Sequence, residues 1–200
     1  MTKLIIFTGT PGSGKSTVLS HLQAKGVKVV NMGTEMQAVL AEKGQTLDRD
    51  KLRLLSNEDT LKARMKVIKR IIDSKTDSII ETHASIKQGS RYIPGFSMDE
   101  LKSIRVTGII YIDAKSEDIL KRRTGDTSRY RADLGVTEAE IDEHRTVNIA
   151  ILSSFALHLG IPLYIVENEE GKIKDTVKEV DRIVKELFGA LGREESLKAG

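Results

Sequence analysis

Nine consecutive residues near the start of the chain have the types and spacing of a phosphate-binding loop. They fit the pattern G-x-x-x-x-G-K-[ST], and they are Gly9, Thr10, Pro11, Gly12, Ser13, Gly14, Lys15, Ser16 and Thr17. Glycines let a backbone approach a polyphosphate closely and turn successive amide groups toward it. Lys15 can reach the outer phosphates, and the hydroxyl of Ser16 can hold Mg2+. The stretch therefore predicts a site for a polyphosphate and its metal ion, rather than a glycine-rich turn that happens to carry a lysine.

The segments on either side place this loop between a strand and a helix. Residues 3–8 form a short apolar run that stops at a glycine, which is typical of a buried parallel strand. Residues 17–24 contain neither glycine nor proline and favour a helix. The start of a helix adds unpaired N–H donors and a partial positive charge, so this junction favours the binding of phosphate.

The rest of the chain alternates between predicted strands and predicted helices. Apolar runs predict further strands at residues 27–30, 77–83, 106–112 and 163–166. Capped or amphipathic segments predict helices at residues 36–44, 56–72, 116–125, 137–159 and 173–187. This alternation predicts an α/β fold of three layers, α/β/α, around a five-stranded parallel sheet.

Two further local predictions concern the middle of the chain. The helix that follows Ser56 has apolar residues at helical spacing, and they predict a row that faces the core: Leu61, Met65, Ile68 and Ile72. Residues 87–95 contain two glycines and a proline and are predicted as a loop.

Residues that follow the strands are candidate ligands, because parallel sheets of this kind bind ligands beyond the carboxyl ends of their strands. Glu81 ends the third strand. Its carboxylate either serves Mg2+, directly or through water, or caps the following turn. His83 either contacts a phosphate or a base or makes a structural hydrogen bond. Gly33 and Thr34 follow the second strand and are expected at the same edge.

Arginines form the second group of candidates, because guanidinium groups stay charged and can bind two phosphate oxygens at once. Two pairs flank or lie within a polar segment bounded by Gly125 and Gly135, namely Arg122 with Arg123 and Arg129 with Arg131. They predict cations around a phosphoryl group in transfer. The alternative is that these arginines form a solvated charged face. Arg53 is a candidate for an acceptor phosphate, and Lys87 and Arg91 are candidates for further contacts.

Composition limits the possible classes of protein. A chain of 200 residues suits one domain, and the absence of cysteine removes disulfides and thiolate metal ligands. The net charge of +3 and the aromatic content of 4% do not favour a nucleic-acid partner. No apolar run approaches the length of a membrane span. We expect one domain over residues 1–188, without a membrane, and a loose tail over residues 189–200.

Several motifs, taken in order along the chain, resemble those of archaeal-type adenylate kinases, a family of P-loop nucleoside monophosphate kinases. The resemblance extends to about residue 187. Besides residues 9–17, it rests on residues 31–36, 48–54, 81–87, 89–95, 122–129 and 141–148. Several independent motifs in the correct order are more specific than the phosphate-binding loop alone.

The resemblance implies the P-loop NTPase fold and reversible, Mg2+-dependent transfer of the terminal phosphoryl group of ATP to AMP. It also implies a cytoplasmic protein, often a homotrimer. In this chain it implies that residues 9–17 bind ATP, that Ser16 and Glu81 serve Mg2+, and that a set of cations is catalytic: Lys15, Arg122, Arg123, Arg129 and Arg131. It implies an AMP-side segment over residues 31–75 and a short mobile lid over residues 125–135. The AMP-binding residues are expected to be Gly33, Thr34, Arg53, His83, Lys87 and Arg91.

The chain departs from the family pattern at two positions. Glu81 stands where the family commonly has aspartate, and Gln37 replaces an arginine that the bacterial type uses for AMP. The AMP contacts must therefore come from other residues. Two other functions also remain open. One is a kinase of the same fold that acts on another nucleoside monophosphate or a small alcohol. The other is a nucleotide-dependent RNA-binding or ribosome-assembly factor that hydrolyses ATP slowly.

Overall fold

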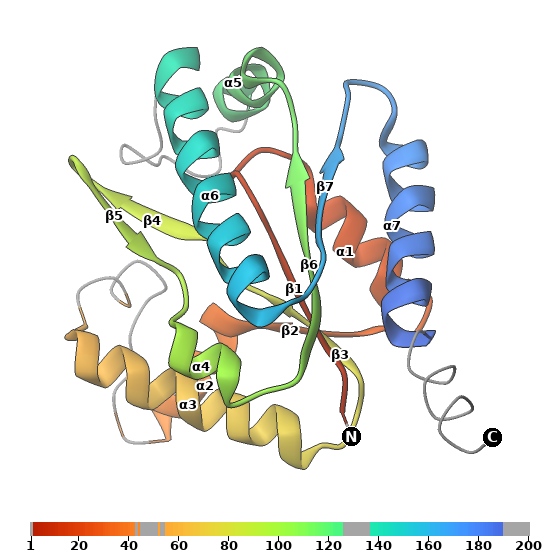
Figure 1. Cartoon of the computed structure of the whole chain (residues 1–200). Coiled ribbons are helices and arrows are strands. Elements are labelled where there is room, and N and C mark those ends of the chain that lie inside the picture. Colours follow the sequence, from red (N-terminus) through yellow and green to blue (C-terminus); the bar gives the residue numbers. More distant parts are fainter. Residues whose placement is uncertain (1, 43, 45–51, 53–54, 126–136, 190–200) are drawn as a thin grey trace.

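The computed structural model describes residues 2–42, 44, 52, 55–125 and 137–189 (Figure 1). Its strands are β1 (Leu4–Gly9), β2 (Lys28–Asn31), β3 (Ser78–Glu81), β4 (Ser85–Gln88), β5 (Arg91–Pro94), β6 (Val106–Asp113) and β7 (Leu163–Glu167). Its helices are α1 (Lys15–Ala24), α2 (Met32–Ala41), α3 (Asn57–Asp73), α4 (Met98–Lys102), α5 (Ser116–Gly125), α6 (Glu138–Leu159) and α7 (Ile173–Gly189).

Five of the strands form one parallel sheet in the order β2-β3-β1-β6-β7. The strand that leads into the phosphate-binding loop, β1, is central and buried along its whole length. Its side chains alternate between the two faces of the sheet. Leu4 and Ile6 join one apolar cluster, and Ile5 and Phe7 join the other. The five predicted strands and the parallel sheet are therefore confirmed.

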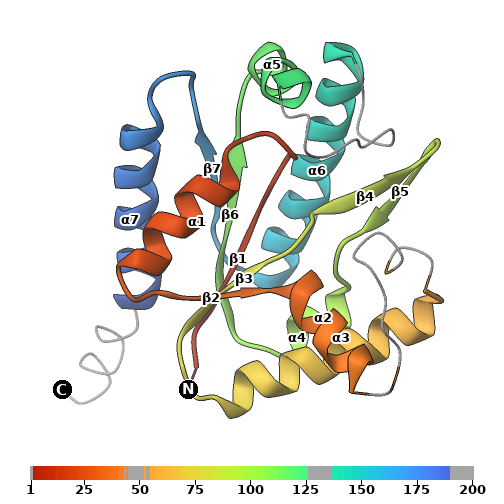
Figure 2. The same cartoon turned by 180° about the vertical axis from the view of Figure 1, so that it is seen from behind.

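Helices cover both faces of the sheet. Helices α1 and α7 pack on the side of Ile5 and Phe7, whereas α2, α3 and α6 contribute to the cluster on the opposite side. Figure 1 shows α6 in front of the sheet. Figure 2 gives the opposite view, in which α1 lies in front of the sheet. The predicted three-layer α/β/α arrangement is confirmed. Among the described residues, no helix is long and apolar enough to cross a membrane.

The long helix α6 begins and ends as its sequence predicts. The hydroxyl of Thr137 accepts the backbone N–H of Glu140, while the carboxylate of Glu140 accepts the backbone N–H of Thr137, which completes a capping box. Gly160 ends the helix with a φ of 65°, a left-handed conformation that glycine adopts without steric cost. These caps fix where α6 begins and ends.

The loop predicted for residues 87–95 is instead part of a β-hairpin, and that prediction was wrong. Strands β4 and β5 pair in antiparallel register from Ser85 opposite Pro94 to Gln88 opposite Arg91. Four-residue strands with a proline at the last pair resemble a loop in sequence. Gly95 closes the base of the hairpin, because a Cβ atom there would lie 1.8 Å from the carbonyl oxygen of His83. The hairpin projects away from the five-stranded sheet (Figure 1).

The core-facing row predicted for α3 is also wrong, except at Ile68. The side chains of the other three are exposed by 38–44%, namely Leu61, Met65 and Ile72. The buried face is instead formed by Ala63, Val67, Ile68 and Ile71. Both rows have helical spacing, so periodicity alone could not choose between them. The packed row contains the small residue Ala63, which permits close approach to the neighbouring elements.

Candidate active site

The phosphate-binding loop joins the carboxyl end of β1 to the N-terminus of α1, as the sequence predicts. Its glycines are needed at specific points. A Cβ atom on Gly9 would lie 2.3 Å from the carbonyl oxygen of Ile112, and one on Gly14 would lie 2.2 Å from Nδ2 of Asn168. Gly12 and Gly14 also have φ values of 92° and 94°, which side-chain-bearing residues rarely adopt. The loop is therefore held against two neighbouring elements that only glycine can approach so closely.

The N-terminus of α1 is open toward an anion. Gly14 is the N-cap and supplies no side-chain hydrogen bond, and the first turn contains no acidic residue. Its amide groups and its partial positive charge are thus not neutralised by a carboxylate from the helix itself. Ser16 and Thr17 are exposed in this turn, and the buried amine of Lys15 donates to the carbonyl oxygen of Gly9 at 2.9 Å. Lys15 therefore lies folded over the loop.

Asn168, which follows β7, is hydrogen-bonded to the phosphate-binding loop. Its Nδ2 donates to the carbonyl oxygen of Ser13 at 2.8 Å, and its Oδ1 accepts the hydroxyl of Thr176 at 3.2 Å. Its backbone N–H donates to the carbonyl oxygen of Asp113 at 2.8 Å. Asn168 is buried, so these three bonds link the loop to β6 and α7. Asn168 was not among the residues predicted for the site, although its position just beyond a predicted strand is a signal that could have identified it.

Arg122 and Arg123 lie in the last turn of α5 beside the same loop. Nε and one terminal nitrogen of Arg123 donate to the carbonyl oxygen of Pro11 at 3.0 and 2.8 Å. Arg122 forms an ion pair with Glu170 at 2.6 Å and lies 3.4 Å from the carbonyl oxygen of Gly12. The structure thus brings two of the predicted arginines to the loop. Residues 126–135 of the predicted lid, which include Arg129 and Arg131, lie outside the described residues, and so does Arg53.

Glu81 and the start of α2 form a second part of the site, on the other side of β1. Nδ2 of Asn31 donates to a carboxylate oxygen of Glu81 at 2.6 Å, while Oδ1 of Asn31 caps α2 by accepting the backbone N–H of Thr34 at 3.0 Å. Gly33 and Thr34 therefore lie in the first turn of α2, next to the strand that ends in Glu81. One asparagine orients both the carboxylate and the helix.

The hairpin carries two of the remaining candidates, Lys87 and Arg91, and it faces α6. Lys87 forms an ion pair with Glu143 of α6 at 3.0 Å and lies 5.4 Å from the ring centre of Tyr92. The hydrogen bond with Glu143 raises the pKa of Lys87, so the amine stays charged. Arg91 is exposed and donates to Gln88 at 3.3 Å. The structure places Lys87 against α6, and His83 lies in the connection between β3 and β4.

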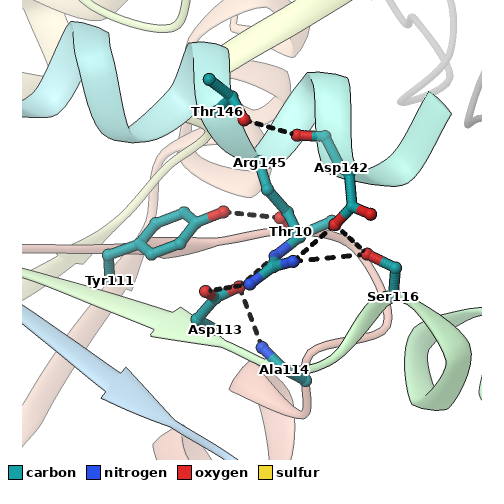
Figure 3. A network of polar contacts seen from close by, with 8 residues as sticks. All are labelled: Thr10, Tyr111, Asp113, Ala114, Ser116, Asp142, Arg145 and Thr146. Atoms are coloured by element: carbon teal, nitrogen blue, oxygen red, sulfur yellow. Dashed lines mark hydrogen bonds and ion pairs between the residues drawn. The ribbon is translucent and has the colours of Figure 1, made fainter. Parts of the chain in front are cut away.

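An ion-pair network joins α6 to the carboxyl end of β6, close to Thr10 of the loop (Figure 3). The guanidinium of Arg145 donates to both carboxylate oxygens of Asp113, at 2.7 and 2.6 Å, and to Asp142 at 2.6 Å. These acidic partners raise the pKa of Arg145, with the hydrogen bond to Asp113 as the largest cause. The hydroxyl of Ser116 at the start of α5 donates to Asp142 as well. The network fixes α5 and α6 to the sheet beside the loop.

Comparison with known proteins identifies the family of this chain. A family model described as an AAA domain matches residues 8–141. The chain is 35% identical to an adenylate kinase of Thermoplasma volcanium over 90% of this chain and 98% of that protein. It is 33% identical to an adenylate kinase of Pyrococcus abyssi over 93% of this chain and 99% of that protein. The chain belongs to the adenylate kinase family.

Solved structures of other kinases share the fold of this chain. A shikimate kinase from Acinetobacter baumannii aligns with a TM-score of 0.56 over 92% of this chain and 93% of that chain, at 19% identity. A sugar kinase from Janibacter aligns with a TM-score of 0.51 over 90% and 92% of the two chains, at 15% identity. At such low identity the likeness concerns the fold alone, and the predicted fold class is confirmed.

One histidine of α6, His144, is buried next to Ser85 at the base of the hairpin. Burial lowers the pKa of His144 below its ordinary value of 6.5, and the charges of Arg123 and Lys87 act in the same direction. A hydrogen bond with Ser85 and the charge of Glu143 act in the opposite direction without cancelling the shift. The neutral imidazole is therefore the favoured form in the folded protein.

We expect the free energy of unfolding to fall as the pH is lowered through the ordinary pKa of histidine. Above about pH 6.5 His144 is neutral in both states and contributes no pH dependence. Below it the unfolded chain binds the proton first, because the folded pKa is lower, and stability declines until the folded pKa is reached. Denaturant unfolding over this range should show a smaller decline for His144→Asn. The exposed His158→Asn should behave like the original chain, and an equal decline in all three proteins would contradict the burial argument.

Proposed function

We propose that this chain transfers the terminal phosphoryl group of ATP to AMP and so forms two molecules of ADP. The observation that carries the proposal is the phosphate-binding loop with its lysine and two arginines, in a chain 35% identical to an adenylate kinase across 98% of that protein. Transfer between two bound nucleotides needs cations on the donor phosphates and around the moving group. At this end of the sheet, Lys15 of α1 and the arginines Arg122 and Arg123 of α5 supply these cations.

On the donor side, the loop amides and Lys15 would hold the phosphates of ATP. The amine of Lys15 would exchange the carbonyl oxygen of Gly9 for a phosphate oxygen, which is a stronger, charge-assisted partner. Arg122 and Arg123 would stabilise the charge on the group in transfer. A phosphate oxygen of AMP attacks the terminal phosphorus in line, the bond from that phosphorus to the bridging oxygen breaks, and ADP leaves. No covalent intermediate with the protein is required.

On the acceptor side, we assign AMP to the space bordered by α2, the end of β3 and the hairpin. The proposed contacts are Gly33, Thr34, Arg53, His83, Lys87 and Arg91, within and beyond the AMP-side segment 31–75. We assign the lid to residues 125–135 with Arg129 and Arg131, and the catalytic domain to residues 1–188. By family resemblance we also propose a cytoplasmic homo-oligomer, specifically a trimer, which sedimentation of the purified protein would test.

The residues at the loop fit a magnesium ion. The hydroxyl of Ser16 and the carboxylate of Glu81 are hard oxygen donors, which Mg2+ prefers, and the ion usually completes its shell with water and substrate phosphates. When bound, Mg2+ would neutralise charge that develops on the phosphates. Asn31 holds the carboxylate of Glu81 in a fixed orientation.

We expect Glu81→Gln to raise the Mg2+ concentration needed for half-maximal rate by roughly tenfold, because the amide keeps the shape but loses the charge. A titration of Mg2+ at saturating nucleotide measures this change. Glu167→Gln, at the exposed end of β7, is the matched control and should leave the Mg2+ requirement unchanged. An unaltered requirement in Glu81→Gln would favour a structural role for this carboxylate.

The function is tested by mixing the purified protein with MgATP and a panel of acceptors while ADP is measured. Two molecules of ADP for each AMP consumed, with AMP preferred, is the expected result. Preference for another nucleoside monophosphate or for a small alcohol would assign a different acceptor to the same fold. Slow ATP hydrolysis that needs no acceptor, together with affinity for RNA, would instead support the RNA-binding or ribosome-assembly factor.

A further inference from the structure

Arg122 lies where the phosphate-binding loop meets the segment that follows β7, and an acidic residue holds it there. Its Nε and its terminal nitrogen Nη2 both donate to the same carboxylate oxygen of Glu170, at 3.1 and 2.6 Å. Its two terminal nitrogens also donate to the carbonyl oxygens of Gly12 and Asn168, each at 3.4 Å. Of these three partners, the carboxylate is the nearest and the only charged one. The proposed mechanism uses Arg122 but gives Glu170 no role.

The segment that carries Glu170 is fixed at both ends. It begins at Asn168, whose buried side chain is hydrogen-bonded to Ser13 and Thr176. It leads into α7 through Gly171, whose φ of 75° is a left-handed conformation that glycine adopts readily. The side chain of Glu170, in contrast, is 70% exposed. Glu170 can therefore release Arg122 by rotation of its own side chain, while the backbone stays in place.

A donor nucleotide would bring a stronger partner to the same guanidinium. Phosphate groups carry more negative charge than a carboxylate, and arginine binds their oxygens with two N–H groups at once. An exposed ion pair contributes little free energy, so Glu170 could not keep Arg122 from a polyphosphate. The pair would nevertheless have to be broken when the donor binds. The affinity for the donor would therefore be lower by the factor that corresponds to the free energy of the pair.

We propose that Glu170 is a positioning residue that keeps Arg122 beside the empty loop and competes with the donor phosphates for its guanidinium. The role of Glu170 rests on the donor site proposed above, and it sets the affinity for MgATP below the value that Arg122 alone would give. Because the pair is broken before the ground-state complex forms, its cost is the same in the ground state and in the transition state. Such a cost raises KM and leaves kcat unchanged.

The first experiment measures the affinity for a non-hydrolysable analogue of MgATP by calorimetric titration. We expect Glu170→Gln to bind the analogue about threefold more tightly than the original chain, because the amide keeps the shape but no longer neutralises Arg122. Glu169→Gln is the matched control. It removes the same charge from the adjacent residue, whose ion pair is with Lys172 at 2.5 Å, and it should bind the analogue as the original chain does.

The second experiment repeats the titration in a chain that lacks the arginine. Arg122→Gln should weaken binding of the analogue, and the double variant Arg122→Gln/Glu170→Gln should bind no more tightly than Arg122→Gln, since Glu170 acts through Arg122. The same gain in this background would show that Glu170 repels the nucleotide directly, and it would overturn the proposal. An equal gain in Glu169→Gln would do so too, because it would indicate a general effect of net charge. Weaker binding in Glu170→Gln would show that the pair only stabilises the segment.

Steady-state kinetics with MgATP and AMP separate this role from a part in the chemical step. Glu170→Gln should lower KM for MgATP about threefold and leave kcat within about twofold of the original chain. A large fall in kcat would contradict the proposal, because it would place Glu170 in the transfer itself. Binding of the analogue without transfer to AMP would overturn the proposed acceptor and leave the role of Glu170 standing. If the original chain did not bind the analogue, the proposed donor site and the role of Glu170 would both be wrong.

Discussion

Lys15→Met is expected to lower kcat by at least about a hundredfold while the protein remains folded. The side chain of Lys15 is buried against its own loop, where its amine contacts the carbonyl oxygen of Gly9. Methionine has a similar length and can occupy the same space, so the packing of α1 on the sheet should survive. The charge that the proposed mechanism directs at the outer phosphates would be lost. ADP formation at saturating MgATP and AMP measures the effect.

The matching control is Lys178→Met, which removes an exposed lysine from α7. It should leave kcat within a factor of about two, because exposed ion pairs contribute little to stability and this one lies on a different helix from the loop. Thermal unfolding of both variants separates loss of catalysis from loss of fold. Near-normal turnover in Lys15→Met would remove the central assignment of the site.

The centre of the sheet was predictable from sequence because the strands β3, β1 and β6 are buried on both faces and consist largely of apolar residues. The strand β1 and the long strand β6 show this plainly, and each stops at a glycine or a carboxylate. The phosphate-binding loop was predictable for a different reason. Its glycines are dictated by local contacts, such as the carbonyl oxygen of Ile112 against Gly9, and local constraints leave a local pattern in the sequence.

Features that depend on contacts between distant residues were not predictable in the same way. The buried face of α3 is chosen by neighbours that periodicity does not reveal, so the row through Leu61 was selected wrongly. The hairpin has short strands whose pairing leaves little periodic signal. Asn168 and Arg145 meet partners 155 and 32 residues away in the chain. The position of Asn168 just beyond a predicted strand places it at the ligand-binding edge of the sheet, but neither position indicates which distant residue is the partner.

Gly14→Ala is expected to weaken binding of MgATP at least tenfold, through the geometry of the loop rather than through any lost ligand contact. The new Cβ would lie 2.2 Å from Nδ2 of Asn168, which is itself held by Ser13 and Thr176 and has little freedom to move. The φ of 94° at this position adds strain of about 1–3 kcal/mol for a residue with a side chain. Since Gly14 caps α1, relief of either conflict would displace the amides that are proposed to hold phosphate. Calorimetric titration with a non-hydrolysable analogue of MgATP measures the change.

Gly26→Ala separates the two causes. Gly26 has a φ of 83°, comparable with that of Gly14, but a Cβ there would meet no atom within 4 Å. This control therefore carries the backbone strain without the clash, and it lies just beyond the opposite end of α1. We expect it to lose stability while its affinity for the analogue stays within about twofold. If Gly14→Ala bound the analogue as tightly as Gly26→Ala does, the close contact between the loop and Asn168 would not be what shapes the phosphate site.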